Sequence, residues 1–509
     1  MVLDIDPSSG TALYVQIRNG IERLIRSGLM APRSRLPPSR ELAISLGVSR
    51  NTVTSAYDEL EADGLVSSQV GRGTYVCADL PGRTPDGVAP ALSQEVLEAL
   101  LADSWRKPHA SLLTALGQIP DPEAGTAAIS FVSGQPDPKL LPLQEFRESA
   151  LASFRRFGAE LLGVGSASGF APLLDYLPAY LAQRGVLCRP ADLMIAGGVQ
   201  QGLSLIARIF LDPGDTVLLE NLTYPGALAV FRSIPATCVG IPMDADGMRV
   251  DVLENVLKRR SAKLLYTIPT FHNPTGATLP ADRRKRVLEL CREHGVLIVE
   301  DDYAHELSFD GRETLPLKAW DDWGGTIYLG SFSESVCPGI RLCWILAPRP
   351  IIERLHMLKQ VSDLSTSPIL QGALLEFCRR GHLARLLKRK RRVYGARRDA
   401  MARAMQRHLP AQASWIKASG GLYQWVDLPS CLDAMDLLAQ TRKRGVLFAP
   451  DRVFSVEEWS RGGIRLGFAD VPEDRIEEGI GILGQAMKAG LRRPGIEPAA
   501  GRRHHSGEV

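Results

Sequence analysis

The segment Thr326-Ile-Tyr-Leu-Gly-Ser-Phe-Ser-Glu-Ser-Val-Cys-Pro-Gly-Ile-Arg341 decides the fold of the larger part of this chain. Its first part, 326–331, is mostly apolar and β-favouring, which predicts a buried strand. The second part is more polar and contains a Pro-Gly pair, so it predicts a loop after the strand. In open α/β sheets, ligands bind in the crevice at the carboxyl ends of the strands. The loop 331–341 is therefore the first candidate for a functional site.

Six further apolar segments carry the same signal, and amphipathic stretches alternate with these strand candidates along the chain. The segments are 193–196, 216–220, 236–241, 262–268, 296–301 and 342–347. Such alternation is typical of an α/β fold with a mainly parallel central sheet. We expect this domain to occupy residues 128–490.

The composition narrows the class of protein. A length of 509 residues predicts more than one domain, and there is no apolar run long enough to cross a membrane. The N-terminus lacks the basic and apolar regions of a secretion signal. Eight cysteines occur without a Cys-x-x-Cys pair, which indicates reduced thiols rather than disulfides or a metal site. We therefore expect a cytoplasmic protein without a bound metal ion.

The first 77 residues predict a separate small domain of helices and a hairpin. Apolar residues of helical period predict a first helix over 12–27. Ser39 is predicted to cap a second helix, 40–46, and Ser49 a third, 50–63. A tight Gly47-Val48 turn joins these two, which is the arrangement of a helix-turn-helix.

The third helix would place polar side chains at its N-terminal end, where they reach base edges in the major groove of DNA. The hairpin 65–76 is predicted to be a wing, with an arginine at its tip for the minor groove. The residues expected to contact DNA are Arg40, Ser49, Arg50, Asn51, Thr52, Thr54 and Arg72. Residues 1–76 carry eight Arg against eight Asp and Glu, so a winged helix that contacts protein is the alternative. We favour DNA, because the arginines gather at the expected DNA face and the acids lie late in the third helix.

Three motifs of this region resemble the winged helix of GntR-type regulators. They are Leu36-Pro-Pro-Ser-Arg-Glu-Leu-Ala43, Leu46-Gly-Val-Ser-Arg-Asn-Thr-Val53 and Gly71-Arg-Gly-Thr-Tyr-Val76. The resemblance implies that double-stranded DNA is a partner and that the protein is bacterial and nucleoid-associated by function. A Pro/Gly-rich linker, 78–127, follows the domain and contains one candidate helix, 92–101. A disordered tail is expected over 491–509.

The larger domain resembles the fold-type I aminotransferases that use pyridoxal 5'-phosphate (PLP). Besides the loop 331–341, the motifs are Ala196-Gly-Gly-Val-Gln-Gln-Gly-Leu203, Tyr224-Pro-Gly226, Pro269-Thr-Phe-His-Asn-Pro-Thr-Gly276 and Glu300-Asp-Asp-Tyr303. A GntR-type head on such a domain is similar to the MocR subfamily of transcriptional regulators. This resemblance implies a smaller C-terminal α+β subdomain, a homodimer and a small-molecule effector.

The resemblance also implies a role for each motif residue. Tyr224 would stack on the cofactor ring, Asn273 and Tyr303 would bind its 3-hydroxyl, and Asp301 would pair with its ring nitrogen. The phosphate would be held by Ser331, Ser333 and Arg341 together with backbone N–H groups at Gly198 and Val199. Arg465 would bind the carboxylate of an amino acid effector. Taken singly, each of these residues could instead serve the fold, as a turn former, a core side chain or half of an ion pair.

One position departs from the family pattern at the point where the chemistry begins. Glu334 stands where those enzymes have a lysine, and a carboxylate cannot form a Schiff base. We therefore expect no catalytic residue, and PLP or pyridoxamine 5'-phosphate bound non-covalently if either is bound. Beside Asp301, the carboxylate of Glu334 would favour a cation such as the ammonium of pyridoxamine phosphate.

Three functions remain open from the sequence. The first is a DNA-binding regulator whose aminotransferase-like domain senses a small ligand. The second is a PLP-dependent aminotransferase with an attached DNA-binding head, for which Lys318 lies too far back along the chain to replace Glu334. The third is a regulator whose large domain is a cofactor-free scaffold. The basic segment 383–399 is expected to be a solvated helix face, with a second DNA contact as the alternative.

Overall fold

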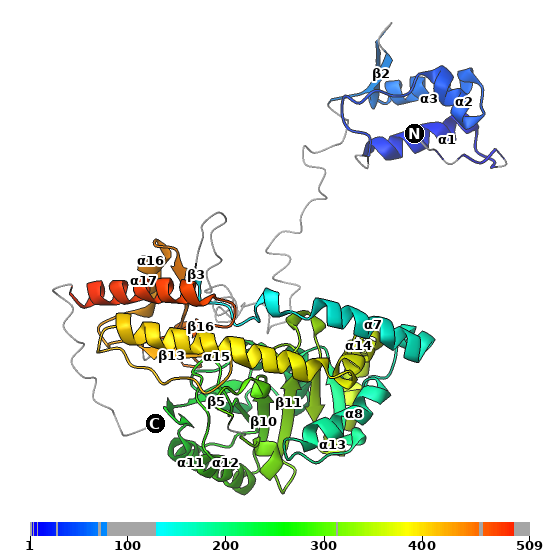
Figure 1. Cartoon of the computed structure of the whole chain (residues 1–509). Helices are drawn as coiled ribbons and strands as arrows, with labels where there is room; N and C mark the ends of the chain where they lie inside the picture. The colour runs from blue at the N-terminus through cyan, green and yellow to red at the C-terminus, as the bar shows by residue number, and fades with distance from the viewer. Residues whose placement is uncertain are drawn as a thin grey trace. The chain divides into compact units, whose positions relative to one another are not determined.

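A computed structural model of the chain describes residues 3, 5–7, 9–26, 29–69, 73–78, 129–311, 314–457 and 462–492. The chain separates into two compact units, residues 1–101 and 102–509, drawn in Figure 1. The predicted helix 92–101 and the tail from residue 493 onward lie outside the described residues. Within the described ranges, no helix is long and apolar enough to cross a membrane.

The described residues of the N-terminal unit form three helices and a two-stranded hairpin, as predicted for the first 77 residues. The helices are α1 (Leu13–Arg26), α2 (Ser39–Leu46) and α3 (Arg50–Ala62), and the strands are β1 (Val66–Gln69) and β2 (Gly73–Val76). The two strands pair antiparallel, which makes the wing. A fully buried set of aliphatic side chains from α1 and α3 forms the centre of this unit: Ile17, Ile21, Ile25, Val53 and Leu60.

The two predicted helix caps have different outcomes. Ser49 is the N-cap of α3, and its hydroxyl oxygen accepts the backbone N–H of Thr52 at 3.1 Å. The prediction for Ser39 is wrong, because α2 begins one residue earlier than expected and Pro38 occupies the N-cap position. The Ser39 hydroxyl instead accepts a long hydrogen bond of 3.4 Å from Nε of Arg50.

We call the second unit, residues 102–509, the body. It contains a seven-stranded sheet in the order β4-β12-β11-β10-β9-β5-β6. β12 pairs antiparallel with both of its neighbours, and every other pairing in this sheet is parallel. All seven strands fall within the segments predicted from the sequence, give or take a residue at either end. Their bounds are β4 (Leu193–Ala196), β5 (Thr216–Glu220), β6 (Thr237–Ile241), β9 (Leu264–Thr267), β10 (Leu297–Asp302), β11 (Thr326–Ser331) and β12 (Cys343–Leu346).

Helices cover both faces of this sheet, because its strands are apolar on both sides. One face packs against α9 (Val199–Phe210), α10 (Pro225–Ser233) and α13 (Arg349–Ser362). The other face packs against α8 (Ala171–Ala182), α11 (Val250–Arg259), α12 (Ala281–His294) and α14 (Pro368–Arg379). Along β10, Val299 belongs to the first face and Ile298 to the second, so Asp301 and Asp302 also point to opposite faces.

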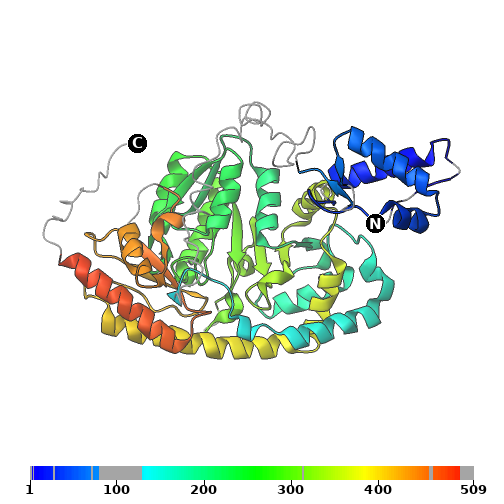
Figure 2. The ribbon, with the colours of Figure 1, turned by 90° about the horizontal axis from the view of Figure 1, so that it is seen from above.

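A smaller α+β subdomain completes the body, as the resemblance implied. Its long helix α15 (His382–His408) lies beside α17 (Glu473–Leu491), and Figure 2 shows the two in yellow and red. The other α-helices and strands described in the body as a whole are α7 (Leu143–Phe157), α16 (Ala434–Arg442), β3 (Ile129–Ser130), β7 (Met243–Asp244), β8 (Gly247–Met248), β13 (Tyr423–Asp427), β14 (Val446–Leu447), β15 (Ala449–Pro450) and β16 (Gly463–Gly467).

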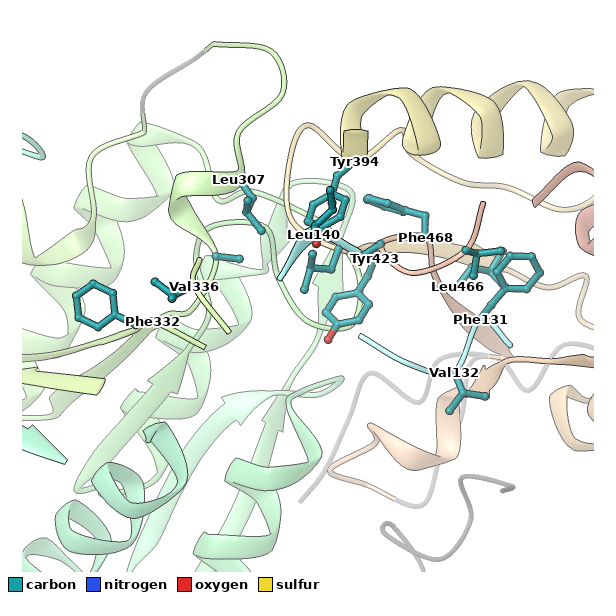
Figure 3. Close-up of a cluster of buried hydrophobic side chains, with 14 of the residues drawn as sticks. Phe131, Val132, Leu140, Leu307, Phe332, Val336, Tyr394, Tyr423, Leu466 and Phe468 are labelled. Carbon is teal, nitrogen blue, oxygen red and sulfur yellow. The ribbon is translucent and has the colours of Figure 1, made fainter. Parts of the chain in front are cut away.

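One apolar cluster joins the loop after β11 to this subdomain. Figure 3 shows its members, among them Phe332 and Val336 from the loop, Tyr394 from α15 and Tyr423 from β13. All four side chains are buried. The loop 331–341 therefore packs against residues of both the sheet domain and the smaller subdomain.

Candidate functional site

The residues predicted for a cofactor pocket come together at the carboxyl ends of the strands. Asp301, at the end of β10, is 2% exposed, and its Oδ2 accepts a hydrogen bond of 2.8 Å from the Tyr266 hydroxyl. Its Oδ1 is buried and has no hydrogen-bond partner in the part of the chain that the structure describes. Burial raises the pKa of this carboxyl to about 7. A cationic or hydrogen-bonding partner would stabilise the ionised form of such a buried carboxyl.

A cradle for an anion lies where α9 begins. Gly198 is the N-cap of α9 and has a φ of 101°, a conformation that favours glycine. A Cβ atom at this position would lie 2.5 Å from Nη2 of Arg341, so the guanidinium sits directly against the glycine. The backbone N–H groups at the start of a helix and a guanidinium together suit a phosphate. Val199 is the first residue of α9, as predicted for this cradle.

Two serines of the loop are buried close to this cradle. The backbone N–H of Ser333 donates to Oγ of Ser331 at 3.0 Å, which fixes the turn that follows β11. Ser331 is 3% exposed and Ser333 is 9% exposed. Both serines are thus buried in the loop, and their contact with a phosphate stays a prediction.

The pKa of Tyr224 indicates which charged groups lie near its hydroxyl. It is the N-cap residue of α10, and its hydroxyl donates a 3.4 Å hydrogen bond to Oε1 of Gln200. Its pKa is raised, chiefly by burial and then by the negative charges of Asp301 and Glu334, and the positive charges of Arg341 and Arg465 oppose this rise. Four charged groups that are distant in sequence therefore act on one hydroxyl.

Arg465 is held from several sides. Its Nη1 donates to Oδ1 of Asn273 at 2.9 Å, and its Nη2 donates to the carbonyl of Val132 at 2.7 Å. The guanidinium carbon lies 4.1 Å from the ring centre of Tyr423 and 4.7 Å from that of Phe454. The guanidinium is therefore stacked and oriented before any ligand arrives, in a position that suits a carboxylate.

Asn273 and Tyr303 are engaged within the protein. The Asn273 side chain accepts from Arg465, and the peptide bond between Asn273 and Pro274 is cis. The Tyr303 hydroxyl donates to the carbonyl of Phe271 at 2.9 Å, and a buried environment raises its pKa. Both residues lie at the pocket, and their predicted contacts with a 3-hydroxyl group stay predictions.

Glu334 projects from the loop into this charged surrounding. Its Oε2 is buried and unpartnered among the described residues. Burial raises the pKa of its carboxyl to about 7, and the nearby positive charges of Lys390 and Arg341 counteract that rise. The loop thus presents an acidic group at the position where the resemblance calls for an amine.

The sequence predicts that Lys318 lies too far from Glu334 to replace it. In the structure it is held at the start of β11, the end away from the loop that carries Glu334. Its Nζ donates to Oδ2 of Asp321 at 3.0 Å and to the carbonyl of Thr326 at 2.9 Å. Thr326 begins the strand and the loop of Glu334 follows its last residue. Lys318 therefore has no access to the pocket in this structure.

The expectation that segment 383–399 is a solvated helix face is wrong for three of its basic residues. Lys390 is fully buried, and Arg397 and Arg398 are 9% and 6% exposed. Arg397 pairs with Asp137 at 2.6 Å, and Arg398 donates to the carbonyl of Ala418 at 2.6 Å. The sequence analysis missed Lys390, because a basic run on a helix does not reveal which of its members points inward.

Two cavities of the body are lined by residues other than those predicted to bind the cofactor. One, of about 320 Å³, is lined by Thr275, Gly276 and Trp415 among others. Another, of about 520 Å³, is lined by His305, Glu306 and Arg391 among others. The candidate pocket is therefore defined by its side-chain chemistry and by the strand ends, not by the size of a hollow.

The candidate DNA-binding face of the N-terminal unit is polar and accessible. Five of the predicted residues are exposed and Thr52 is half-buried; the five are Arg40, Ser49, Arg50, Asn51 and Thr54. Arg72, predicted at the tip of the wing, lies outside the described residues. The start of α3 therefore presents a guanidinium, an amide and hydroxyls outward.

The acidic residues late in α3 are engaged inside the unit. Arg18 of α1 pairs with Asp63 at 2.6 Å and lies 3.8 Å from Glu59. Glu61 accepts the backbone N–H of Ser68, in the first strand of the wing, at 2.8 Å. These contacts lie at the end of α3 that is far from Arg50.

Comparison with known proteins identifies both units. Residues 13–76 match the model of the gntR family of bacterial regulatory proteins, and residues 158–483 match that of aminotransferase class I and II. The body is similar to the kynurenine aminotransferase of Pyrococcus horikoshii solved in complex with PMP. That likeness has 35% identity and a TM-score of 0.71 and covers 79% of this chain and 98% of the other.

Two regulators are similar over nearly the whole chain. The HTH-type transcriptional regulator TauR of Rhodobacter capsulatus is 32% identical over 95% of this chain and 98% of its own length. The probable rhizopine catabolism regulatory protein MocR of Rhizobium meliloti is 30% identical over 96% of each chain. Together, fold and comparisons define a DNA-binding transcriptional regulator with an aminotransferase-like domain. The chain belongs to the MocR-type regulators of the GntR family.

Proposed function

We propose that the aminotransferase-like domain of this regulator senses a vitamin B6 phosphate or a related cationic effector and binds it without a covalent bond. Pyridoxamine 5'-phosphate is the preferred form. The observation that carries the proposal is that the negative charges of Asp301 and Glu334 both act on Tyr224, in a pocket that also has the anion cradle of Gly198 and Arg341. In this reading the domain is not an enzyme, and ligand binding changes how the DNA-binding units engage the operator.

The residues present fit a B6 phosphate at both of its ends. The unpartnered Oδ1 of Asp301 would accept a hydrogen bond from a protonated ring nitrogen. The N–H groups at the start of α9 and the guanidinium of Arg341 would hold the phosphate. Glycine at position 198 makes room for this guanidinium, because a side chain there would fill the space that it occupies. When bound, the group supplies an electron-withdrawing ring, and this chain's own residues would only bind and orient it.

Glu334 supports a binding function over transamination. Covalent attachment of the cofactor needs a nucleophilic amine, and a carboxylate cannot provide one. A second carboxylate near Asp301 also disfavours a neutral aldehyde and favours an ammonium group at the same place. The amine form of the vitamin would therefore bind more tightly than the aldehyde form.

The effector side of the pocket has a receptor of its own. Arg465 is stacked between Tyr423 and Phe454, which suits the carboxylate of an amino acid. An amino acid or amine effector could bind there together with the B6 phosphate. Homodimer formation and the position of Arg72 at the DNA are further parts of this proposal, and both follow from the family resemblance.

Titration of the purified full-length protein with pyridoxamine phosphate and with PLP, followed by calorimetry, tests the proposal. We expect pyridoxamine phosphate to bind more tightly and PLP to remain removable by gel filtration after borohydride treatment. A borohydride-stable adduct would overturn the non-covalent reading and favour the aminotransferase alternative, which the 35% identity to a kynurenine aminotransferase keeps in view. Binding of neither compound would favour a cofactor-free scaffold.

A further inference from the structure

A buried lysine lies directly beneath the loop that carries Glu334. Lys390 of α15 is fully buried, and its Nζ donates to three successive backbone carbonyls. The acceptors are Glu334 at 2.8 Å, Ser335 at 3.1 Å and Val336 at 3.1 Å. An ammonium group has three N–H donors, so this contact uses all of them. The side chain therefore fastens the turn after β11 to the long helix of the subdomain.

The surroundings of this ammonium are apolar, which makes its charge expensive unless an opposite charge compensates it. Val336, whose carbonyl accepts from Lys390, and Leu387 and Tyr394 of the same helix belong to one buried apolar cluster, in which Figure 3 labels Val336 and Tyr394. Burial lowers the pKa of Lys390 to about 8, and the negative charge of Glu334 is the strongest influence in the other direction. Conversely, Lys390 is the foremost positive charge that opposes the raised pKa of Glu334.

Other titratable groups around the two side chains act more weakly or from the side of the pocket. Cys337 and Glu306 also favour the charged form of Lys390. Arg341 favours the charged form of Glu334. The negative charge of Glu334 contributes to the raised pKa of four tyrosines on the surrounding elements: Tyr224, Tyr303, Tyr394 and Tyr423.

We propose that Lys390 is a positioning residue for Glu334: its three carbonyl contacts hold the turn that carries Glu334, and the two side chains form a pair of opposite charges that interact without direct contact. The ammonium fixes the turn by its three carbonyl contacts, and its positive charge favours the ionised form of Glu334 beside the ligand pocket. Lys390 is thus not a displaced nucleophile, because its amine is spent on backbone carbonyls. This inference rests on the proposed function for its consequence in ligand binding, but the pair itself can be tested without a ligand.

The first experiment measures thermal unfolding of the ligand-free full-length protein in a double-mutant cycle. The variants are E334Q, K390M and E334Q/K390M, with K388M as the matched control at an exposed position of the same helix. We expect K390M to lower the melting temperature by several degrees and the double variant to lie above K390M, because it leaves no unpaired buried charge. Strictly additive shifts would overturn the pair. If K390M does not fold, K390Q replaces it in the cycle, since Gln keeps a hydrogen-bond donor.

The second experiment titrates pyridoxamine 5'-phosphate into the same variants between pH 6 and 8. K390Q should weaken binding about tenfold when Glu334 is present and by much less in the E334Q background; equal weakening in both would overturn the charge role. Borohydride treatment with PLP, followed by peptide mass spectrometry, should leave Lys390 unmodified, and a label there would show a displaced nucleophile instead. If the wild type binds no pyridoxamine phosphate, the proposed function fails, while the unfolding cycle still decides the pair.

Discussion

Tyr266 donates its hydroxyl to Oδ2 of Asp301 at 2.8 Å and leaves Oδ1 of the same carboxylate buried without a partner among the described residues. The two residues lie on adjacent parallel strands, β9 and β10. One half of the carboxylate is therefore satisfied by the protein, and the other half is available to a ligand. Under the proposed function, the free oxygen would accept a cationic ring, and an ionised Asp301 would be unfavourable until such a ring binds.

The penalty predicts a pH-dependent effect of Asp301→Asn. The folded protein holds the Asp301 proton up to a pKa of about 7, whereas an ordinary carboxyl releases it near 3.8. Between these values the unfolded state binds fewer protons, so this group makes the folded state less stable as the pH rises. The melting temperature of D301N relative to the wild type should therefore increase by a few degrees from pH 5 to pH 8. A constant difference across this range, measured by calorimetry without ligand, would contradict the raised pKa.

Restoring an amine in the loop tests whether the rest of the pocket is competent. Glu334→Lys should allow PLP to attach covalently, which borohydride and peptide mass spectrometry would detect. The new ammonium would lie close to Lys390, so E334K should melt several degrees below the wild type. E334K/K390M should recover part of this loss and retain attachment. Failure of both variants to attach PLP would mean that the pocket lacks more than the amine.

The two serines at the starts of α2 and α3 provide a matched pair for stability. Ser49→Ala removes a cap hydrogen bond and should destabilise the N-terminal unit by about 1 kcal/mol. Ser39→Ala removes no cap contact and should be nearly neutral. Chemical denaturation followed by circular dichroism would compare them, and equal losses would argue against the assigned caps.

Arg50→Ala should weaken sequence-specific operator binding by roughly 1–3 kcal/mol, because its guanidinium lies at the exposed start of α3. Arg26→Ala is the control, since Arg26 is an exposed arginine of α1 that pairs with Glu22 at 2.7 Å. Footprinting and fluorescence anisotropy at two salt concentrations would separate loss of specificity from loss of phosphate contacts. An unchanged footprint with R50A would refute α3 as the recognition helix.

Much of this architecture could be predicted from the sequence. The seven strands follow from short apolar runs, and the cap at Ser49 follows from a serine before an amphipathic run. Lys390 escaped prediction because helical period places it on α15 but does not say that a turn 56 residues earlier in the chain packs against it. The cap at Ser39 failed for a local reason, since Pro38 holds the N-cap position itself.

The alternation along β10 has a consequence for how such regulators diversify. Asp301 faces the pocket, while its neighbour Asp302 pairs with Arg184 at 2.6 Å and accepts the Tyr328 hydroxyl at 2.6 Å on the opposite face of the sheet. Under the proposed function, substitutions at Asp301 would change which effector is recognised and leave the ion pair of Asp302 on the other face intact. An insertion or deletion of a single residue in this strand would exchange the two roles and lose both at once. Under the same proposal, ligand choice would change by point substitution in this strand and not by a change in its length.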